Sequence, residues 1–277
     1  MRPIIITALL AVLCLPVSVQ AITLKGHLVQ GGMVIGKVDP ATKVRFQGKR
    51  VLVSPQGLFV IGFSRDAKAD AFIELRRSSG PSQRFPLHIK RRSYRIQRIN
   101  GLPPDKVTPS PAEMVRIRKE SALVRKARRR DDPRIDFTEP FIWPVTGRIS
   151  GVYGSQRILN GKPRRPHLGV DIAVPVGTPV KAAADGVVSL ADDDMFFSGG
   201  TLIIDHGHGI STDYLHLHKI LVKPGQRVHR GDVVALSGAS GRVTGPHLHW
   251  GMNWFQTRLD PSLMVPPMPK HAPAKKE

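Results

Sequence analysis

Short apolar runs broken by turn residues fill residues 137–260, and this texture constrains the fold more than any other feature of the chain. Gly, Pro and Asp interrupt the runs at short intervals, and no apolar pattern with a helical period persists for a useful length. Such spacing is typical of β-strands separated by tight turns. We therefore predict an all-β domain with an antiparallel sheet, bounded at residues 137–265.

Residues 22–100 carry a second alternating pattern. Apolar and polar residues alternate in short runs, for example 44–46 and 58–63, and Gly and Pro mark loops at 55–57 and 79–81. This pattern favours a small antiparallel sandwich. We predict an Ig-like β-sandwich that is smaller than the C-terminal domain. Its role is predicted to be accessory, because none of its residues forms a motif that indicates catalysis.

The segment 101–136 is predicted to be a linker that contains a basic helix. A Pro-rich break at 101–109 precedes Ser110 as N-cap, Pro111 at N1 and Glu113 at N3, the arrangement of a capping box. A narrow stripe at helical spacing can pack on a neighbour: it consists of Met114, Ile117, Ser121 and Val124. The other faces are basic, with Arg116, Arg118, Lys119, Arg125, Lys126, Arg128, Arg129 and Arg130. Two interpretations stay open, a solvated linker helix or a surface that binds an anionic polymer.

The first 21 residues have the pattern of a cleaved signal peptide. Arg2 provides a positive start, residues 4–15 form a short apolar core, and 19–21 (Val-Gln-Ala) resemble a cleavage site. The apolar run is well short of the roughly 20 residues that a transmembrane helix needs. Cys14 is the only cysteine, so no disulfide is expected in the mature chain. Lipidation at Cys14 is a minor alternative, disfavoured by the bulky residue before it. We therefore expect a periplasmic or secreted protein without a transmembrane segment.

The chain is strongly basic, with 42 Lys and Arg against 21 Asp and Glu and a formal net charge of +21. Such a charge favours anionic partners. Export and the lack of an RNA-recognition or zinc-finger motif argue against nucleic acid. A carboxylate-bearing polymer of the cell wall fits better. Residues 266–277 are rich in Pro and Lys and are predicted to be a disordered tail.

Three histidine-containing stretches carry the predicted chemistry. They are Pro166 to Asp171, Tyr214 to His218 and Gly245 to Trp250. Successive side chains alternate faces in a strand, so His247 and His249 are expected to point the same way. His167 and Asp171 add an imidazole nitrogen and a carboxylate oxygen, a donor set that suits a catalytic zinc ion with three protein ligands and one open position.

The five site residues divide between metal binding and proton transfer. We assign one zinc ion to His167, Asp171 and His249. Hydrolysis also requires that water loses a proton and that the leaving amine gains one, and imidazole suits both transfers. His216 and His247 are therefore predicted to transfer protons and to stabilise the oxyanion.

The C-terminal domain resembles the lysostaphin/LytM-type family of zinc endopeptidases. The resemblance rests on H-x-G-x-D, Y-x-H-L and G-P-H-L-H-W signatures at His167 to Asp171, Tyr214 to Leu217 and Gly245 to Trp250, with supporting matches at Tyr153-Gly154, Arg157, Gly161, Gly186 to Val188, Val228 and Gly231-Asp232. It covers roughly residues 140–262. It implies a zinc site at His167, Asp171 and His249, catalysis by His216 and His247, and a substrate among peptidoglycan cross-links or stem peptides. His218 and Leu168 depart from the residues that are common in the family, and neither has an assigned role.

Two rival functions compete with a peptidoglycan endopeptidase. The first is a catalytically inactive relative that binds the wall and activates other hydrolases, but such a protein should lack at least one ligand. The second is a basic exported scaffold that binds wall polymer or anionic lipid through residues 113–130, and this role could coexist with catalysis. Which cross-link or stem bond is cut is left open.

Other polar residues are weaker candidates. His206 and His208 are expected on a turn in a structural or exposed role. His218 is expected to be exposed, and Asp192 to Asp194 to lie in a solvated loop. Arg157 and Arg242 could each bind a substrate carboxylate by bidentate hydrogen bonds, and simple surface charge is the equal alternative.

Overall fold

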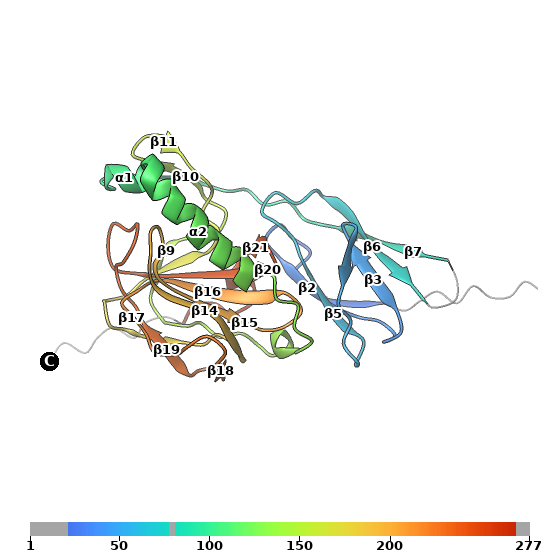
Figure 1. Ribbon diagram of the computed structural model, residues 1–277. Helices are drawn as coiled ribbons and strands as arrows, with labels where there is room; N and C mark the ends of the chain where they lie inside the picture. Colours follow the sequence, from blue (N-terminus) through green and yellow to red (C-terminus); the bar gives the residue numbers. More distant parts are fainter. Residues whose placement is uncertain (1–21, 78–80, 270–277) are drawn as a thin grey trace, which may run out of the picture.

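The computed structural model describes residues 22–77 and 81–269, which form two lobes of β-structure, with one long helix lying over the C-terminal lobe (Figure 1). The predicted signal peptide and residues 270–277 of the predicted tail lie outside the described residues. The all-β prediction is confirmed, since the long helix α2 is accompanied only by short helical turns in the described ranges. No helix in these ranges combines the length and the apolar character needed to cross a membrane.

The N-terminal lobe consists of two small antiparallel sheets. One has the strand order β1-β2-β5, with β1 at Thr23–Gly26, β2 at Met33–Lys37 and β5 at Leu58–Gly62. The other has the order β4-β3-β6-β7, with β4 at Lys49–Val51, β3 at Lys43–Phe46, β6 at Asp70–Arg76 and β7 at Gln83–His88. Buried side chains such as Phe46, Phe63 and Ile73 fill the core of this lobe. The more specific prediction of an Ig-like arrangement stays a prediction.

The C-terminal lobe is built on an eight-stranded sheet with the order β18-β14-β15-β16-β20-β12-β9, to which β21 adds beside β20. Its strands are β9 Arg148–Gly151, β12 Val170–Ala173, β14 Gly186–Met195, β15 Gly199–Asp205, β16 Ile210–Leu217, β18 Arg227–Val228, β20 Leu248–Trp254 and β21 Thr257–Leu259. A three-stranded sheet flanks it, made of β13 Pro179–Lys181, β19 Val233–Leu236 and β17 Lys219–Ile220. Two 3-10 turns complete the lobe, η1 at Asp136–Thr138 and η2 at Pro261–Leu263. Every residue of β15 and β20 is buried, so both faces of the central sheet are covered.

The two lobes share one continuous hydrophobic core. Phe46 of the N-terminal lobe lies against Trp254 of β20, with ring centroids 5.9 Å apart. Gly62 at the end of β5 has no room for a side chain, because a Cβ atom there would lie 2.7 Å from Leu259 and 2.8 Å from Trp254. The N-terminal lobe is therefore packed tightly on the β20–β21 hairpin.

The segment between the lobes starts with a strand that the sequence did not indicate. Strand β8 (Ile96–Ile99) pairs in parallel with β10 (Gln156–Leu159), which also pairs with β11 (Lys162–Pro163). By pairing, β8 therefore belongs with the C-terminal lobe, although its residues lie within the range predicted for the N-terminal sandwich. A short helix, α1 (Pro104–Val107), follows in the segment predicted as a Pro-rich break.

The long helix α2 (Pro111–Ala127) begins where the capping box predicted. Ser110 Oγ accepts a hydrogen bond from the backbone N–H of Glu113, and Glu113 Oε2 accepts one from the backbone N–H of Ser110 at 2.6 Å. The expected apolar stripe packs only in part, because Ile117 is buried whereas Met114 is 36% exposed. Figure 1 shows α2 (green) crossing over the strands of the C-terminal lobe.

The end of the helix is anchored to a buried carboxylate in the sheet. Asp213 of β16 is fully buried, and its oxygens accept hydrogen bonds from Arg128 (3.3 Å), Arg258 (3.1 and 3.2 Å) and Asn253 (2.7 Å). Burial alone would raise the pKa of Asp213, but the two guanidinium groups outweigh it and hold the pKa well below its usual range. Arg128, predicted as part of an exposed basic face, is thus a structural ion-pair partner.

Candidate metal centre

The pairing of three strands brings the predicted site residues together. Asp171 on β12 lies directly opposite His249 on β20, and Leu215 on β16 lies opposite the same histidine from the other side. His167 precedes β12 and folds back over it. Gly169 between them has no space for a side chain, because a Cβ atom would lie 2.5 Å from His249 Nε2. The glycine of the H-x-G-x-D pattern is therefore required by the close approach of an imidazole.

His167, Asp171 and His249 form a compact buried group whose potential ligand atoms all lie within 4.8 Å of one another. Asp171 Oδ1 is 2.9 Å from His167 Nε2 and 2.8 Å from His249 Nδ1, and the two nitrogens are 3.0 Å apart. Zinc bound at about 2.0–2.1 Å in a tetrahedral site separates its ligand atoms by about 3.3 Å. A small outward shift of these side chains would thus accommodate such an ion, and the N, O, N donor set suits it.

Electrostatics hold His167 and Asp171 in the forms that bind a metal. Burial is the main cause that lowers the pKa of His167, to about 4, so this imidazole is neutral at pH 7. Its Nδ1–H donates to the backbone carbonyl of Val152 at 3.1 Å, which leaves the lone pair on Nε2, the atom that faces Asp171. Burial would raise the pKa of Asp171, but the hydrogen bonds and charges of His167 and His249 outweigh it and keep the pKa well below its usual value.

His216 and His247 lie at the open side of this group. Their ring centroids are 4.8 Å apart, and His216 lies 6.2 Å from His249. The Nδ1–H of His216 donates to Ser240 O at 2.9 Å, and that of His247 donates to the carbonyl oxygen two residues before it at the same distance. In both rings Nε2 therefore carries the lone pair and can accept a proton.

His216 has two further features of a functional residue. Its backbone adopts φ of 64°, in the left-handed region that non-glycine residues rarely occupy. Burial, followed by the proximity of His247 and His249, lowers the pKa of His216 to about 3. The imidazole is consequently neutral at pH 7.

Arg157 has a role that the sequence did not resolve. Its Nη2 donates to Asp171 Oδ2 at 2.8 Å, so the guanidinium holds the carboxylate by the oxygen that does not face the histidines. Gly151 makes this approach possible, because a Cβ atom there would lie 2.4 Å from the same oxygen. Arg157 is therefore a positioning residue for Asp171 rather than free surface charge.

The remaining candidates lie away from the group. His206 and His208 are buried near the β15–β16 turn, in the structural alternative that was predicted. His218 is exposed, as expected. Asp193 and Asp194 are exposed as well, although they lie at the end of β14 rather than in a loop.

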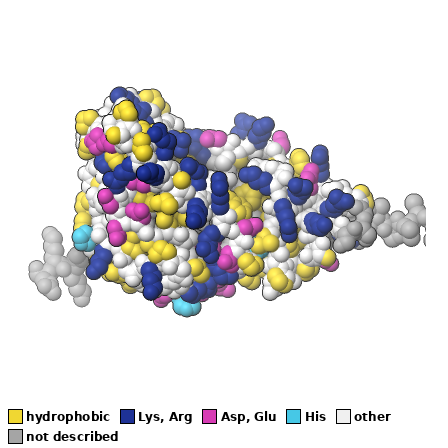
Figure 2. All heavy atoms as spheres, in the orientation of Figure 1, with side chains coloured by type: hydrophobic (Ala, Val, Ile, Leu, Met, Phe, Trp, Pro, Cys, Tyr) yellow, Lys and Arg dark blue, Asp and Glu magenta, His cyan; other side chains and the backbone are white. Residues whose placement is uncertain are grey.

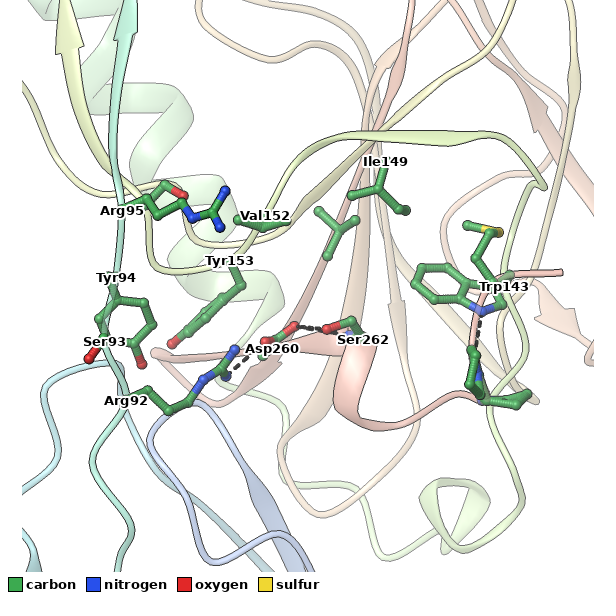
Figure 3. A pocket seen from close by; sticks show the side chains of 15 residues that line it. Arg92, Ser93, Tyr94, Arg95, Trp143, Ile149, Val152, Tyr153, Asp260 and Ser262 are labelled. Carbon is green, nitrogen blue, oxygen red and sulfur yellow. Dashed lines mark hydrogen bonds and ion pairs between the residues drawn. The ribbon is translucent and has the colours of Figure 1, made fainter. Parts of the chain in front are cut away.

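A second, larger cavity lies on the other side of β9. It measures about 430 Å³ and is lined by Arg92–Arg95 in the segment before β8, by β9 and by residues 266–268. Figure 3 shows Arg92 paired with Asp260 and Trp143 hydrogen-bonded to the backbone at Pro266. The disorder predicted for the tail thus does not describe Pro266. Among the described residues that line this cavity there is no histidine, so it does not contain the imidazoles of the predicted site.

The fold and the site define a two-lobed β-protein with a buried His–Asp–His metal group beside two further histidines. Residues 165–261 match peptidase family M23. A crystal structure of a peptidase M23 from Pseudomonas aeruginosa is similar over 86% of this chain and 94% of that chain, with 35% sequence identity and a TM-score of 0.66. The chain belongs to peptidase family M23.

Two curated relatives match half of this chain or less. The peptidoglycan DD-endopeptidase ShyA of Vibrio cholerae is 48% identical over 104 residues, which are 37% of this chain and 24% of the relative. The DD-carboxypeptidase/endopeptidase Mpg of Neisseria meningitidis is 34% identical over 138 residues, 50% of this chain and 31% of the relative. The chain therefore matches 24% and 31% of the length of these two relatives.

Proposed function

We propose that the chain is a zinc-dependent endopeptidase that hydrolyses peptide bonds in peptidoglycan cross-links or stem peptides. The observation that carries the proposal is the buried group of His167, Asp171 and His249, with ligand atoms within 4.8 Å of one another. The names of ShyA and Mpg support the substrate class. All five expected site residues are present and converge, which favours an active enzyme over an inactive activator.

The proposed mechanism divides the work between the metal group and its two neighbours. When bound, zinc supplies a Lewis acid that polarises a carbonyl and makes water more acidic. His216 and His247 line the groove, and backbone carbonyls occupy the Nδ1 atom of each ring, so Nε2 of one ring accepts the proton of the attacking water. The imidazolium formed in this step then donates its Nε2 proton to the leaving amine. The second ring stabilises the developing oxyanion when it is protonated at Nε2, because only then does that nitrogen donate a hydrogen bond.

Digestion of purified sacculi by the mature protein tests this function. The zinc-loaded protein should release muropeptides, a chelator should stop the release, and added zinc should restore it. Mass spectrometry of the products identifies which bond is cut. If the fully zinc-loaded protein released nothing from sacculi of several cross-link types, the proposal would be wrong.

We further propose that the protein acts outside the cytoplasm, in the periplasm or as a secreted protein, after removal of residues 1–21. The predicted export signal and the peptidoglycan substrate support this location. N-terminal sequencing of the protein recovered from the producing cells should begin at Ile22. A chain that retained Met1 in the cytoplasm would contradict the proposal.

We also propose that α2 contributes an anionic-surface contact. The viewed face carries many Lys and Arg side chains on both lobes (Figure 2). Ion pairs occupy Arg116, Arg128 and Arg130. The exposed basic residues of the helix and its C-terminal end that form no ion pair within the described ranges are Arg118, Lys119, Arg125, Lys126 and Arg129.

Charge reversal separates this contact from the chemistry. Because exposed charges are screened over about 8 Å at physiological ionic strength, binding through them should weaken with salt. Arg125→Glu, Lys126→Glu and Arg129→Glu together should lower sacculus binding and flatten its salt dependence, while hydrolysis of a small soluble cross-linked peptide stays nearly unchanged. Unchanged sacculus binding would favour the solvated linker helix.

A further inference from the structure

The metal group opens into a small groove whose walls come from three parts of the chain. The groove measures about 160 Å³, and Asp171, His216 and His247 form its catalytic side. Arg242, on the connection between β19 and β20, lines it, as does Gln97 of β8. The inter-lobe segment therefore contributes to the surface that a substrate would meet.

Arg242 is a fixed cation without a carboxylate partner among the described residues. Its backbone N–H donates to the backbone oxygen of Phe197 at 2.9 Å. Its guanidinium lies over the phenyl ring of Phe197, 4.5 Å from the ring centroid. One guanidinium nitrogen, Nη1, donates weakly to the backbone oxygen of Lys106 at 3.3 Å. Burial, followed by the charges of Arg157 and Arg164, lowers the pKa of Arg242 to about 10. A nearby anion would relieve this unfavourable environment.

Two buried polar atoms of the groove also lack a partner within the described chain. They are Nε of Arg157, whose Nη2 already binds Asp171, and Oε1 of Gln97. The two residues lie opposite each other in the parallel β8–β10 pair. Buried polar groups are normally hydrogen-bonded, so an unused donor and an unused acceptor in one groove point to a ligand. A peptide offers both complements, a carboxylate for the donor and an N–H for the acceptor.

We infer that Arg242 and Arg157 Nε form a carboxylate-binding subsite beside the metal group, which holds a free carboxylate of the stem peptide next to the bond that is cut. This inference rests on the proposed function and adds a basis for substrate choice. The lining residues with permanent charge are two arginines and one aspartate, so the groove is positive even before a divalent ion adds its charge. Charge-assisted hydrogen bonds from guanidinium groups suit a carboxylate in geometry and strength.

The test compares Arg242→Gln with the wild type on two cross-linked muropeptide dimers that differ only in a free or amidated diaminopimelate carboxylate. For the wild type, kcat/KM should be roughly 10- to 100-fold higher with the free carboxylate. Arg242→Gln should lower kcat/KM by a similar factor on the free substrate and by less than about threefold on the amidated one. Arg242→Lys should restore part of the preference.

Arg164→Gln is the matched control. Arg164 also donates to a backbone oxygen near the end of α1, to Val107 O at 2.8 Å, but it does not line the groove. Its replacement should change kcat/KM by the same factor on the free and the amidated substrate. If Arg242→Gln lowered kcat/KM by the same factor on both substrates, Arg242 would only support the fold, and the inference would be overturned.

Binding of the product peptides separates this inference from the proposed function. Calorimetry with the zinc-loaded wild type should give a lower Kd for the free than for the amidated stem tetrapeptide, and Arg242→Gln should remove the difference. Discrimination in binding without any hydrolysis would support the subsite and contradict the endopeptidase. Equal Kd values for both peptides with the wild type would overturn the subsite even if hydrolysis occurred.

Discussion

The C-terminal lobe contains three His-x-His pairs, and only the pair His247 and His249 contributes a member to the group of His167, Asp171 and His249. His247 and His249 lie at the start of β20, where His249 faces Asp171 across the β12 pairing. His206 and His208 lie near a tight turn, and both are as buried as the metal group. Spacing and burial therefore do not distinguish His249 from His206 and His208.

His206 differs from the metal group in what occupies its ring nitrogens. His206 donates from Nδ1 to Asp185 O at 2.6 Å, and its Nε2 lies 2.8 Å from Thr212 Oγ1, so both nitrogens have partners within the protein. Its ring also packs edge-on against Phe141. In the metal group, backbone oxygens take one nitrogen of His167 and leave the other beside an ionised carboxylate. The carboxylate of Asp171, supplied by the neighbouring strand, thus distinguishes the metal group from His206.

Removal of a ligand should give the largest contrast between the pairs. His249→Ala should no longer bind one zinc ion per chain, because the two remaining ligands hold the ion weakly. Its turnover should fall to that of the wild type treated with a chelator. His206→Gln should retain one zinc ion per chain. Elemental analysis of both purified variants measures this, and full zinc occupancy in His249→Ala would show that the ligand assignment is wrong.

Replacement of the two neighbouring histidines should separate chemistry from metal binding. His216→Ala and His247→Ala should each keep zinc and lose roughly 10²–10⁴-fold in kcat, since that is the usual contribution of a general acid or base. Zinc content and turnover of a soluble cross-linked peptide are measured on the same preparations. Near-wild-type turnover by both variants would rule out the proposed roles.

The structural histidine should appear in the pH dependence of stability. Burial is the main cause that lowers the pKa of His206 to about 4 from 6.5, so the unfolded chain binds a proton that the folded chain excludes between these values. Stability should thus fall as pH decreases from about 6.5 to 4, by about 3 kcal/mol from this residue.

Urea unfolding of the chelated wild type and of His206→Gln, at several pH values, measures this contribution. The variant should have lower stability at pH 7 and a flatter profile, and the difference between the two curves removes the contributions of His167 and His216. Parallel curves would mean that His206 is not the residue that titrates.

The smallest expected effect concerns the guanidinium that holds the carboxylate. Arg157→Gln should weaken zinc binding by roughly 10- to 100-fold, the usual effect of losing a group that orients a metal ligand. Competition with a chromogenic chelator measures the affinity. Arg227→Gln, which removes an ion pair with Asp136 on the surface, is the control and should leave the affinity unchanged. Equal affinities for the wild type and Arg157→Gln would show that Asp171 needs no such support.

The sequence predicted features whose determinants are local. The capping box at Ser110 and Glu113 placed the start of α2, and the period-2 pattern at His247 and His249 placed both rings on one side. The assignment of residues to zinc and to catalysis stays a prediction. Features that depend on distant pairing were missed. The bond from Arg157 to Asp171 and the β8–β10 pair, which joins residues about 60 positions apart, require a fold that local patterns do not specify.

The buried carboxylate of Asp213 also limits where a truncated fragment that contains the catalytic lobe can begin. The match to the peptidase family begins at residue 165, yet Arg128, one of the two cations that neutralise Asp213, comes from the end of α2. A fragment that starts at residue 137 would leave this carboxylate with Arg258 as its single cation, in the sheet strand next to the one that carries His249. Loss of one partner from a buried ion pair is strongly destabilising. The minimal autonomous unit therefore extends upstream of the catalytic domain suggested by sequence similarity, and fragments designed for expression should retain the helix.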